Sequence, residues 1–158
     1  MLVYRIVHTF YSKQLFASGA KERWNGLGKK VIYAAESISL AFLENMVRRQ
    51  GVGFNNDFKI MFIEIPDRTI ISEITISKIV VGWRDSNDYS KCQPLGDKWY
   101  NAAKTLVLKV PSAVLPASYN YVINSEHADF GLIKLVAITD LVPDERIEDI
   151  LKKYPSKY

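Results

Sequence analysis

One glutamate in this 158-residue chain stands where an apolar residue is expected. Residues 36–50 have helical periodicity, and four of them follow the i, i+3, i+4, i+7 spacing of a core-facing stripe: Leu40, Leu43, Glu44 and Val47. A carboxylate in such a stripe loses hydration free energy unless a partner compensates, which makes Glu44 a candidate functional group. In the alternative interpretation, Glu44 lies at the edge of the stripe and pairs with Arg48 one turn later. The spacing leaves both interpretations open.

A second group of candidate residues precedes this helix, in a loop at residues 18–30. Arg23-Trp24-Asn25 combines a planar cation suited to phosphate, an aromatic plate and an amide donor. The loop also contains three glycines, whose backbone can approach a ligand closely: Gly19, Gly26 and Gly28. Taken alone, the tripeptide favours a plainer interpretation, a surface arginine beside a core tryptophan. The stretch 26–30 lacks the glycine and Ser/Thr positions of a Walker loop.

Sequence patterns predict the elements that must position these residues. Strands are expected at residues 2–10, 31–33, 58–65, 69–76, 105–110, 119–123 and 132–138. Helices are expected at 36–50, 95–104 and 143–153, with Ser37 capping the first, and Gly51 and Gly53 ending it. Helices interrupt runs of strands without strict βαβ alternation. The pattern therefore predicts a single compact α+β domain over residues 1–158, with a mixed or antiparallel sheet and flanking helices.

Composition excludes several classes of protein. The chain is 48% hydrophobic, and 21 Lys+Arg against 17 Asp+Glu give a formal charge of +4, typical of a globular protein. Its basic residues form separate pairs rather than one block, so we expect no direct nucleic-acid binding. Two histidines and the lone Cys92 predict no metal site, and the single cysteine fits a reducing compartment. No signal peptide or apolar span is recognised, so we expect a cytoplasmic protein without membrane contact.

Several motifs in series resemble the RES domain family, which is named for an arginine, a glutamate and a serine. Each motif is weak alone, but together they cover nearly the whole chain in order. The motifs are Arg23-Trp24-Asn25, Gly28, Tyr33-Ala34-Ala35-Glu36-Ser37, Leu40-Ala41-Phe42-Leu43-Glu44, Gly96-Asp97-Lys98-Trp99, Leu106-Val107-Leu108-Lys109-Val110-Pro111-Ser112, Asn120-Tyr121-Val122-Ile123-Asn124 and His127-Ala128-Asp129-Phe130.

This resemblance implies the toxin of a bacterial toxin–antitoxin pair, with a fold similar to that of ADP-ribosyltransferase toxins. The implied substrate is NAD⁺, cleaved at the nicotinamide–ribose bond by hydrolysis or phosphorolysis, or used to ADP-ribosylate a protein. No cofactor is implied, although inorganic phosphate is an optional co-substrate. The implied partner is an antitoxin with an Xre-type helix-turn-helix domain that blocks the active site. The acceptor of ADP-ribose, the identity of the antitoxin and a homodimeric assembly are left open.

Carried over residue by residue, the resemblance assigns catalytic roles to Arg23, Tyr33, Glu44 and Ser112. Glu44 would stabilise the oxocarbenium-like ribose, and Arg23 would hold the pyrophosphate. Tyr33 would pack against the nicotinamide or ribose, and Ser112 would bind the substrate or orient Glu44. Further implied NAD⁺-binding residues are Arg5, Trp24, Asn25, Asn124 and His127.

Alternatives stay open for several of these residues. Tyr33 could be a core residue of a strand, and Ser112 could merely begin a turn after Pro111. Participation of Glu36 and His127 in the site is undecided, although Glu44 matches the family's Ala-x-x-Glu motif. Two other functions also remain open, an inactive RES-like binding module and a ribonuclease-type toxin.

Overall fold

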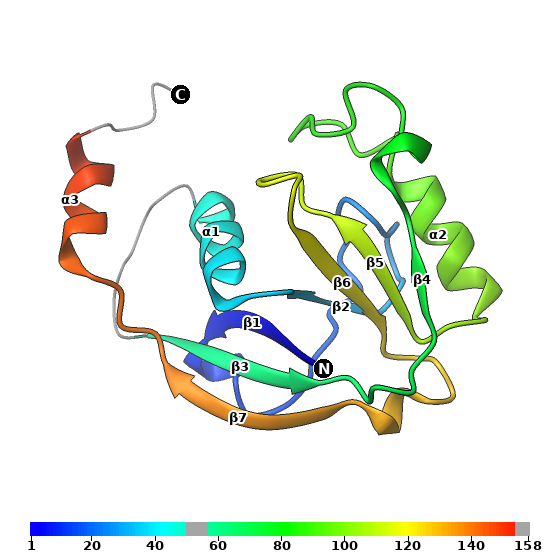
Figure 1. The fold of residues 1–158 in the computed structure, drawn as a ribbon, viewed down its shortest axis with the longest axis horizontal. Helices are drawn as coiled ribbons and strands as arrows, with labels where there is room; N and C mark the ends of the chain where they lie inside the picture. Colours follow the sequence, from blue (N-terminus) through cyan, green and yellow to red (C-terminus); the bar gives the residue numbers. More distant parts are fainter. Residues whose placement is uncertain (50–56, 154–158) are drawn as a thin grey trace.

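The computed structural model describes residues 1–49 and 57–153, which form one twisted sheet with helices around it (Figure 1). The chain order is β1 (Leu2–His8), β2 (Val31–Ala35), α1 (Ile38–Arg48), β3 (Phe58–Glu64), β4 (Ile71–Glu73), α2 (Gln93–Ala102), β5 (Val107–Pro111), β6 (Tyr119–Asn124), β7 (Lys134–Asp140) and α3 (Glu145–Lys153). Short 3₁₀ turns occur at Thr9–Tyr11, Ile76–Lys78 and Phe130–Leu132. The predicted α+β class with a mixed sheet is confirmed.

The seven-stranded sheet is nearly divided into two parts. Its order is β4-β5-β6-β2-β1-β3-β7, with β4 and β5 parallel and every other pair antiparallel. Strand β1 pairs with β3 along its full length, but it pairs with β2 at a single position, Tyr4 opposite Ala35. In Figure 1, β1, β3 and β7 cross the lower part of the molecule, while β5 and β6 turn away from them. The strands β1 and β2 therefore diverge in the middle of the sheet.

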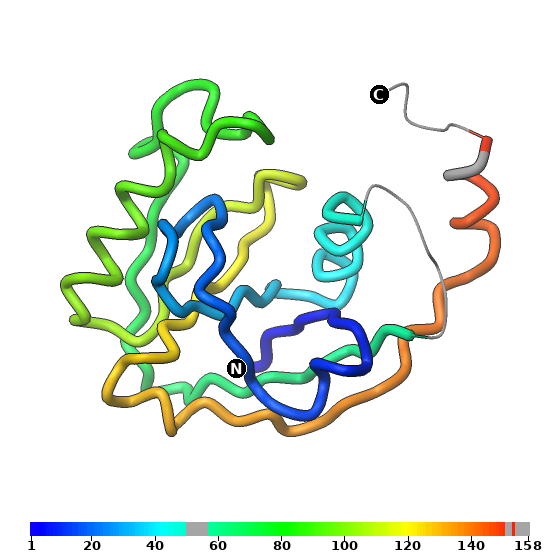
Figure 2. The backbone as a smooth tube through the Cα atoms, turned by 180° about the vertical axis from the view of Figure 1, so that it is seen from behind, coloured from blue at the N-terminus to red at the C-terminus, as the bar shows by residue number. Residues whose placement is uncertain are grey.

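Buried side chains hold this bent sheet against its helices. Leu40 and Ala41 of α1 pack with Ile6, Ala35 and Ile60 of the sheet. On the other side of the divergence, three tryptophans form a core cluster beneath α2, together with Cys92: Trp24, Trp83 and Trp99. Seen from behind, the loop between β1 and β2 lies beside α2 (Figure 2). Helix α1 thus packs on one part of the sheet, and α2 holds the loop between β1 and β2 beside the other part.

Several predicted boundaries change in the structure. Ser37 caps α1 as expected, since its Oγ accepts a hydrogen bond from the Leu40 amide at 3.1 Å. The strand predicted at 69–76 is shortened to β4, because β4 is an edge strand that pairs with β5 over three residues. The predicted helix stops at Gly51 and Gly53 lie outside the described residues. Within the described part of the chain, no helix is long and apolar enough to cross a membrane.

Candidate active site

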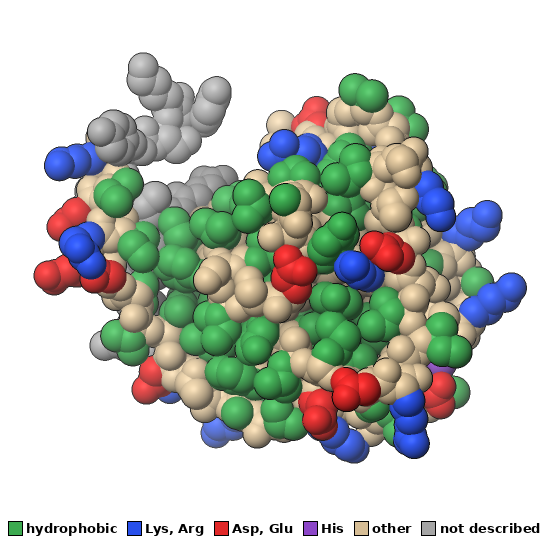
Figure 3. Space-filling view, in the orientation of Figure 1, with side chains coloured by type: hydrophobic (Ala, Val, Ile, Leu, Met, Phe, Trp, Pro, Cys, Tyr) green, Lys and Arg blue, Asp and Glu red, His purple; other side chains and the backbone are tan. Residues whose placement is uncertain are grey.

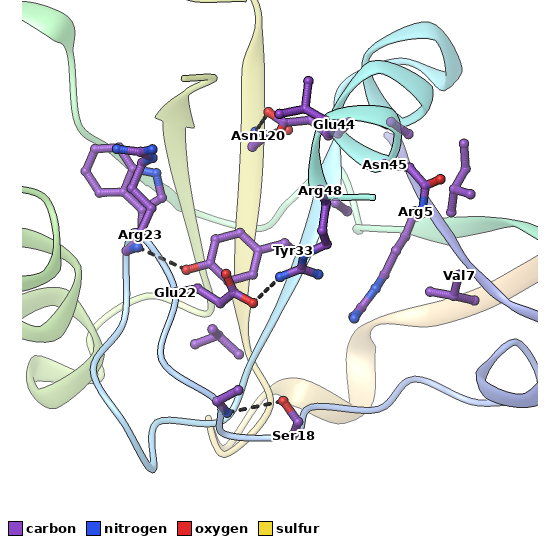
Figure 4. Close-up of a pocket in the computed structure, with 18 of the residues that line it drawn as sticks. Arg5, Val7, Ser18, Glu22, Arg23, Tyr33, Glu44, Asn45, Arg48 and Asn120 are labelled. Atoms are coloured by element: carbon purple, nitrogen blue, oxygen red, sulfur yellow. Dashed lines mark hydrogen bonds and ion pairs between the residues drawn. The ribbon is translucent and has the colours of Figure 1, made fainter. Parts of the chain in front are cut away.

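The divergence of β1 and β2 opens a cavity of about 850 Å³. Its walls come from β1, β2, β3, α1, the start of β6, the segment 11–25 and two short stretches, 86–89 and 113–114. This volume falls within the range of small-molecule and cofactor sites. In Figure 4, polar side chains from four of these elements point into the cavity. Among the described residues, no group of three or more His, Cys, Asp or Glu side chains is arranged to hold a metal ion.

Glu44 lies on the cavity wall with its carboxylate fixed by two donors. Its Oε1 accepts a hydrogen bond from Ser112 Oγ at 2.7 Å and another from Asn120 Nδ2 at 2.6 Å. Ser112 follows β5 and is completely buried, and its Oγ accepts bonds from the amides of Val114 and Leu115. The serine hydroxyl is therefore oriented toward Glu44 by the backbone that follows it. This arrangement gives the cavity a carboxylate with a defined orientation.

The helical stripe predicted around Glu44 is wrong in its second half. Leu40 is buried, but Leu43 and Val47 are exposed. Helix α1 packs on the sheet mainly through its first turns, so its later turns face the cavity and solvent instead of a core. The alternative pairing of Glu44 with Arg48 is also wrong, because Arg48 forms its ion pair with Glu22. Glu44 is instead held by the serine that directly follows β5 and by an asparagine of β6.

Replacing Ser112 by alanine should weaken both the fold and the site. The Ser112→Ala variant leaves two amides and Glu44 without the buried hydroxyl. We expect the free energy of unfolding to fall by about 1–3 kcal/mol, measured by urea denaturation. A matched control is Ser118→Ala in the same loop, since the Ser118 backbone supplies its bond to Ser112. Equal stability of the two variants would contradict the prediction.

Tyr33 uses its hydroxyl to anchor the loop between β1 and β2. The hydroxyl donates to Asn25 Oδ1 at 2.7 Å and accepts from the Trp24 amide at 3.1 Å. Burial is the main cause that raises the pKa of Tyr33 far above its usual value, so the phenol stays neutral. Its ring lines the cavity, while the hydroxyl is occupied by the loop. The part of Tyr33 that a ligand can contact is therefore its apolar ring.

Asn25 is the internal brace of the same loop. Its side chain is 1% exposed, and Nδ2 donates to the carbonyl oxygens of Ala20 at 2.8 Å, Gly26 at 3.1 Å and Lys29 at 3.3 Å. The residue lines the cavity, but its amide is already engaged with the backbone. In this structure the Asn25 amide shapes the loop, and its substrate-binding role stays a prediction.

Tyr33→Phe tests this bracing role. The change removes the partner of a buried amide oxygen while retaining the aromatic ring. We expect a loss of about 1–2 kcal/mol in the free energy of unfolding, measured by thermal or urea denaturation. Tyr119→Phe is a matched control, because Tyr119 does not line the cavity. Its ring, which the change retains, has Lys109 Nζ 3.9 Å from its centre. An unchanged stability of Tyr33→Phe would contradict the bracing role.

The three glycines of the loop have different surroundings. Gly19 and Gly28 have φ of +76° and +86°, and the Gly28 amide donates to the Gly19 carbonyl at 2.8 Å. The Gly26 amide donates to Asp97 Oδ1 of α2 at 2.8 Å. Of the three, Gly19 alone lines the cavity. The prediction of close backbone approach to a ligand therefore fails for Gly26 and Gly28, which close the loop and attach it to α2.

Arg23 lines the cavity, but its guanidinium donates hydrogen bonds to a neighbouring loop. Its Nη1 donates to the carbonyl oxygens of Trp83 and of Asp85, the latter at 3.1 Å, and Nη2 donates to that of Arg84 at 3.4 Å. Its guanidinium also lies 4.8 Å from the centre of the Tyr89 ring. The arginine thus organises the segment 83–89 and is not a free surface residue. Trp24 is 3% exposed and lies in the core, as the plainer interpretation of the tripeptide predicted.

Three other arginines line the cavity: Arg5, Arg48 and Arg49. Arg5 projects from β1, half-buried, and its Nη1 donates to the Phe16 carbonyl at 3.3 Å. Burial first, and then the positive charge of Arg48, lower the pKa of Arg5 to about 10, against the opposing effect of Glu22. Arg5 remains protonated at neutral pH. Sequence reasoning found Arg5 through the family resemblance, but it missed Glu22 as a site residue and assigned Arg48 the wrong partner.

Asn124 and His127 do not line the cavity, so the structure does not bring them together with the other predicted site residues. Along β6, Asn120 lies opposite Ala35 and Asn124 lies opposite Val31, so these two asparagines are separated by about 13 Å. The Asn124 side chain accepts from the Glu126 amide at 2.9 Å, and His127 Nδ1 accepts from the Asp129 amide at 3.1 Å. Both residues shape the turn after β6. Asn120, near the other end of the strand, is a second site residue that the sequence did not reveal.

The fold and cavity define a class of protein, an α+β domain with a ligand-sized cleft containing an oriented carboxylate and several arginines. The chain belongs to the RES domain family, whose model matches residues 2–147. The resemblance read from the motifs is therefore confirmed. Glu36, the competing glutamate, does not line the cavity.

Similar proteins are toxins by name. The chain is 31% identical over 144 residues to the "Prs ADP-ribosylating toxin" of Sphingobium sp. (strain YBL2), covering 88% of this chain and 89% of that protein. It is 29% identical over 152 residues to "Toxin Res" of Photorhabdus laumondii, covering 93% and 97%. Its fold is similar to a chain in the crystal structure of the M. tuberculosis MbcT–MbcA toxin–antitoxin complex. That match has a TM-score of 0.71 at 19% identity and covers 96% of this chain and 88% of that chain.

Proposed function

We propose that this protein is the toxin of a bacterial toxin–antitoxin pair and that it cleaves the nicotinamide–ribose bond of NAD⁺. The observation that carries the proposal is the Glu44 carboxylate, held at a cavity wall by Ser112 and Asn120. The names of its relatives support the same class of activity, because one of them is an ADP-ribosylating toxin. Membership of the RES domain family supports it further.

The chemistry needs a carboxylate more than it needs an acid. Nicotinamide leaves NAD⁺ as a neutral molecule from a cationic ring, so protonation of the leaving group gives little help. The ribose that remains has oxocarbenium character, and a fixed negative charge beside it lowers the barrier. In our proposal Glu44 supplies that charge, and Ser112 and Asn120 keep it in position. The ring of Tyr33 packs against the nicotinamide or the ribose.

The arginines of the cavity suit the other end of the substrate. The pyrophosphate of NAD⁺ carries two negative charges, and guanidinium groups bind phosphate oxygens through paired hydrogen bonds. The ADP-ribosyl group then passes to water, to inorganic phosphate or to a protein side chain. Product identification after reaction with and without phosphate separates the first two acceptors, and transfer of label from NAD⁺ to lysate proteins detects the third.

Release of nicotinamide from NAD⁺ by the purified protein tests the proposal. We expect release by the wild-type chain, followed by chromatography, and its loss in Glu44→Gln. Absence of release with or without phosphate, together with absence of label transfer to lysate proteins, would overturn the proposal. In cells, we expect NAD⁺ to fall before RNA is degraded. The reverse order would favour a ribonuclease, although on the face shown in Figure 3 the basic side chains are dispersed rather than gathered.

We also propose an antitoxin with a helix-turn-helix domain as the partner that covers this cavity. Support comes from the fold match to a chain from a toxin–antitoxin complex. Co-expression with the product of a neighbouring gene should give a complex that releases no nicotinamide from NAD⁺. A complex that retains full activity would contradict this part of the proposal.

A further inference from the structure

An ion pair joins the loop between β1 and β2 to helix α1 across the cavity. Among the described residues, no other ion pair connects these two elements. The Glu22 carboxylate, from the loop between β1 and β2, meets the Arg48 guanidinium near the end of α1. Arg5 extends from β1 toward the same region (Figure 4). All three residues line the cavity. Two guanidinium groups thus share the surroundings of a single carboxylate.

The charges of this cluster are unbalanced. Two arginines and one glutamate leave one positive charge in excess, and the proximity of Arg48 contributes to the lowered pKa of Arg5. Each guanidinium offers five N–H donors in a planar fork, so the two together offer ten, whereas one carboxylate has only about four acceptor sites. A group with several anionic oxygens would satisfy both forks better than Glu22 does. A diphosphate is such a group.

Arg23 is less available for this task than Arg5 and Arg48. Its guanidinium donates to three consecutive carbonyl groups of the segment 83–85 and lies over the Tyr89 ring. Binding a diphosphate through Arg23 would require breaking those contacts. By contrast, movement of the Glu22 side chain alone would leave Arg5 and Arg48 available to a ligand.

The backbone of Glu22 is fixed, so its side chain can move without the loop. Gln93 Nε2 of α2 donates to the Glu22 carbonyl at 2.9 Å. The Glu22 amide donates to the Asn25 carbonyl at 3.0 Å, and the Asn25 amide returns a bond of 3.3 Å. The Glu22 and Arg48 side chains are 32% and 62% exposed. Ion pairs with this exposure are weak and screened by salt, so an incoming dianion can replace the carboxylate.

We propose that Arg5 and Arg48 form the diphosphate-binding site of this protein and that the Glu22 carboxylate occupies it until the ligand displaces it. The inference rests on the proposed function in so far as NAD⁺ is the source of the diphosphate. Glu22 then acts as an internal competitor of the substrate. In the absence of ligand it offsets one of the two neighbouring positive charges.

Binding of inorganic diphosphate to the 158-residue protein, measured by titration calorimetry, tests this inference without any turnover. Glu22→Gln removes the competitor, and we expect it to bind diphosphate about two- to fivefold more tightly than wild type. Arg48→Gln removes a ligand, and we expect about tenfold weaker binding. Orthophosphate should bind more weakly than diphosphate to all variants.

Matched controls separate the site from net charge. Glu73→Gln and Arg146→Gln make the same charge changes in ion pairs outside the cavity, with Lys109 and Asp144 respectively. We expect both to bind diphosphate as wild type does. The inference is overturned if Glu22→Gln binds no more tightly than Glu73→Gln, a comparison that holds even if Arg48→Gln fails to fold. Equal gains for orthophosphate and diphosphate would overturn the assignment to a diphosphate.

The same titrations distinguish this inference from the proposed function. Diphosphate binding that responds to Glu22→Gln as expected, in a protein that releases no nicotinamide, supports the site while the proposed reaction fails. Nicotinamide release by a protein whose diphosphate affinity is unchanged in Glu22→Gln leaves the reaction standing and overturns the site.

Discussion

Glu44→Gln should lower the rate of nicotinamide release from NAD⁺ by at least about 100-fold, because removal of one preorganised electrostatic group costs that much in other enzymes. The amide has nearly the same shape as the carboxylate and can still accept from Ser112 and Asn120 through its oxygen. What it loses is the negative charge that faces the developing oxocarbenium ion. The fold should therefore persist while the chemistry fails.

The measurement is single-turnover release of nicotinamide at saturating NAD⁺, which reports the chemical step rather than binding. Circular dichroism and the melting temperature should match those of the wild type. Glu36→Gln is the matched control, since Glu36 precedes the same helix, does not line the cavity and is the competing glutamate of the motif. If Glu36→Gln loses activity while Glu44→Gln retains it, the prediction is wrong and Glu36 supplies the catalytic carboxylate.

Helical spacing identified Glu44 by an argument that was partly mistaken. The spacing placed the carboxylate on an apolar stripe, yet Leu43 and Val47 of that stripe are exposed. A hydrophobic pattern shows which residues avoid water or contact a partner, but it does not distinguish a core from a cavity wall. The correct element was predicted because local spacing determines a helix. The surroundings of its later turns depend on how the sheet bends.

The partners of the site residues could not be read from the sequence for a related reason. Asn120 is close to Glu44 because β6 lies beside β2 and runs antiparallel to it, an arrangement set by strand order. The same strand carries Asn124 away from the cavity. The motif that contains both residues gives their type and position in the chain, but not the end of the strand that faces the site. Glu22 and Arg48 meet across 26 residues for the same kind of reason.

The divergence of β1 and β2 explains why the site forms where it does. A sheet fully paired at its centre would bury Arg5 and Tyr33 between strands and packed helices, leaving no room for a ligand. A single paired position, Tyr4 with Ala35, keeps the two parts joined while the strands separate beyond it. Arginine side chains then extend into the cavity from β1 and α1. The Glu44 carboxylate is positioned from the other part of the sheet, by β6 and the residue that follows β5. The cavity is thus a direct consequence of incomplete strand pairing.

Gly96→Ala should destabilise the protein more than an alanine at any glycine of the loop between β1 and β2. A Cβ at Gly96 would lie 1.8 Å from the carbonyl oxygen of Trp24 and 2.7 Å from its carbonyl carbon. Both groups are backbone, so neither can rotate away, and α2 must separate from the loop that carries Trp24. We expect a loss of about 3 kcal/mol in the free energy of unfolding, at the upper end of the cost of overpacking.

The displacement should also reach the active site. The Trp24 amide binds the Tyr33 hydroxyl, and the neighbouring Asn25 accepts from it, so movement of this backbone alters the wall that faces Glu44. Nicotinamide release from NAD⁺ should therefore fall even at temperatures where Gly96→Ala remains folded. Gly131→Ala is the matched control, because a Cβ there meets no atom within 4 Å. Equal melting temperatures for the two variants would show that α2 and the loop are not held in the close contact that fixes this wall.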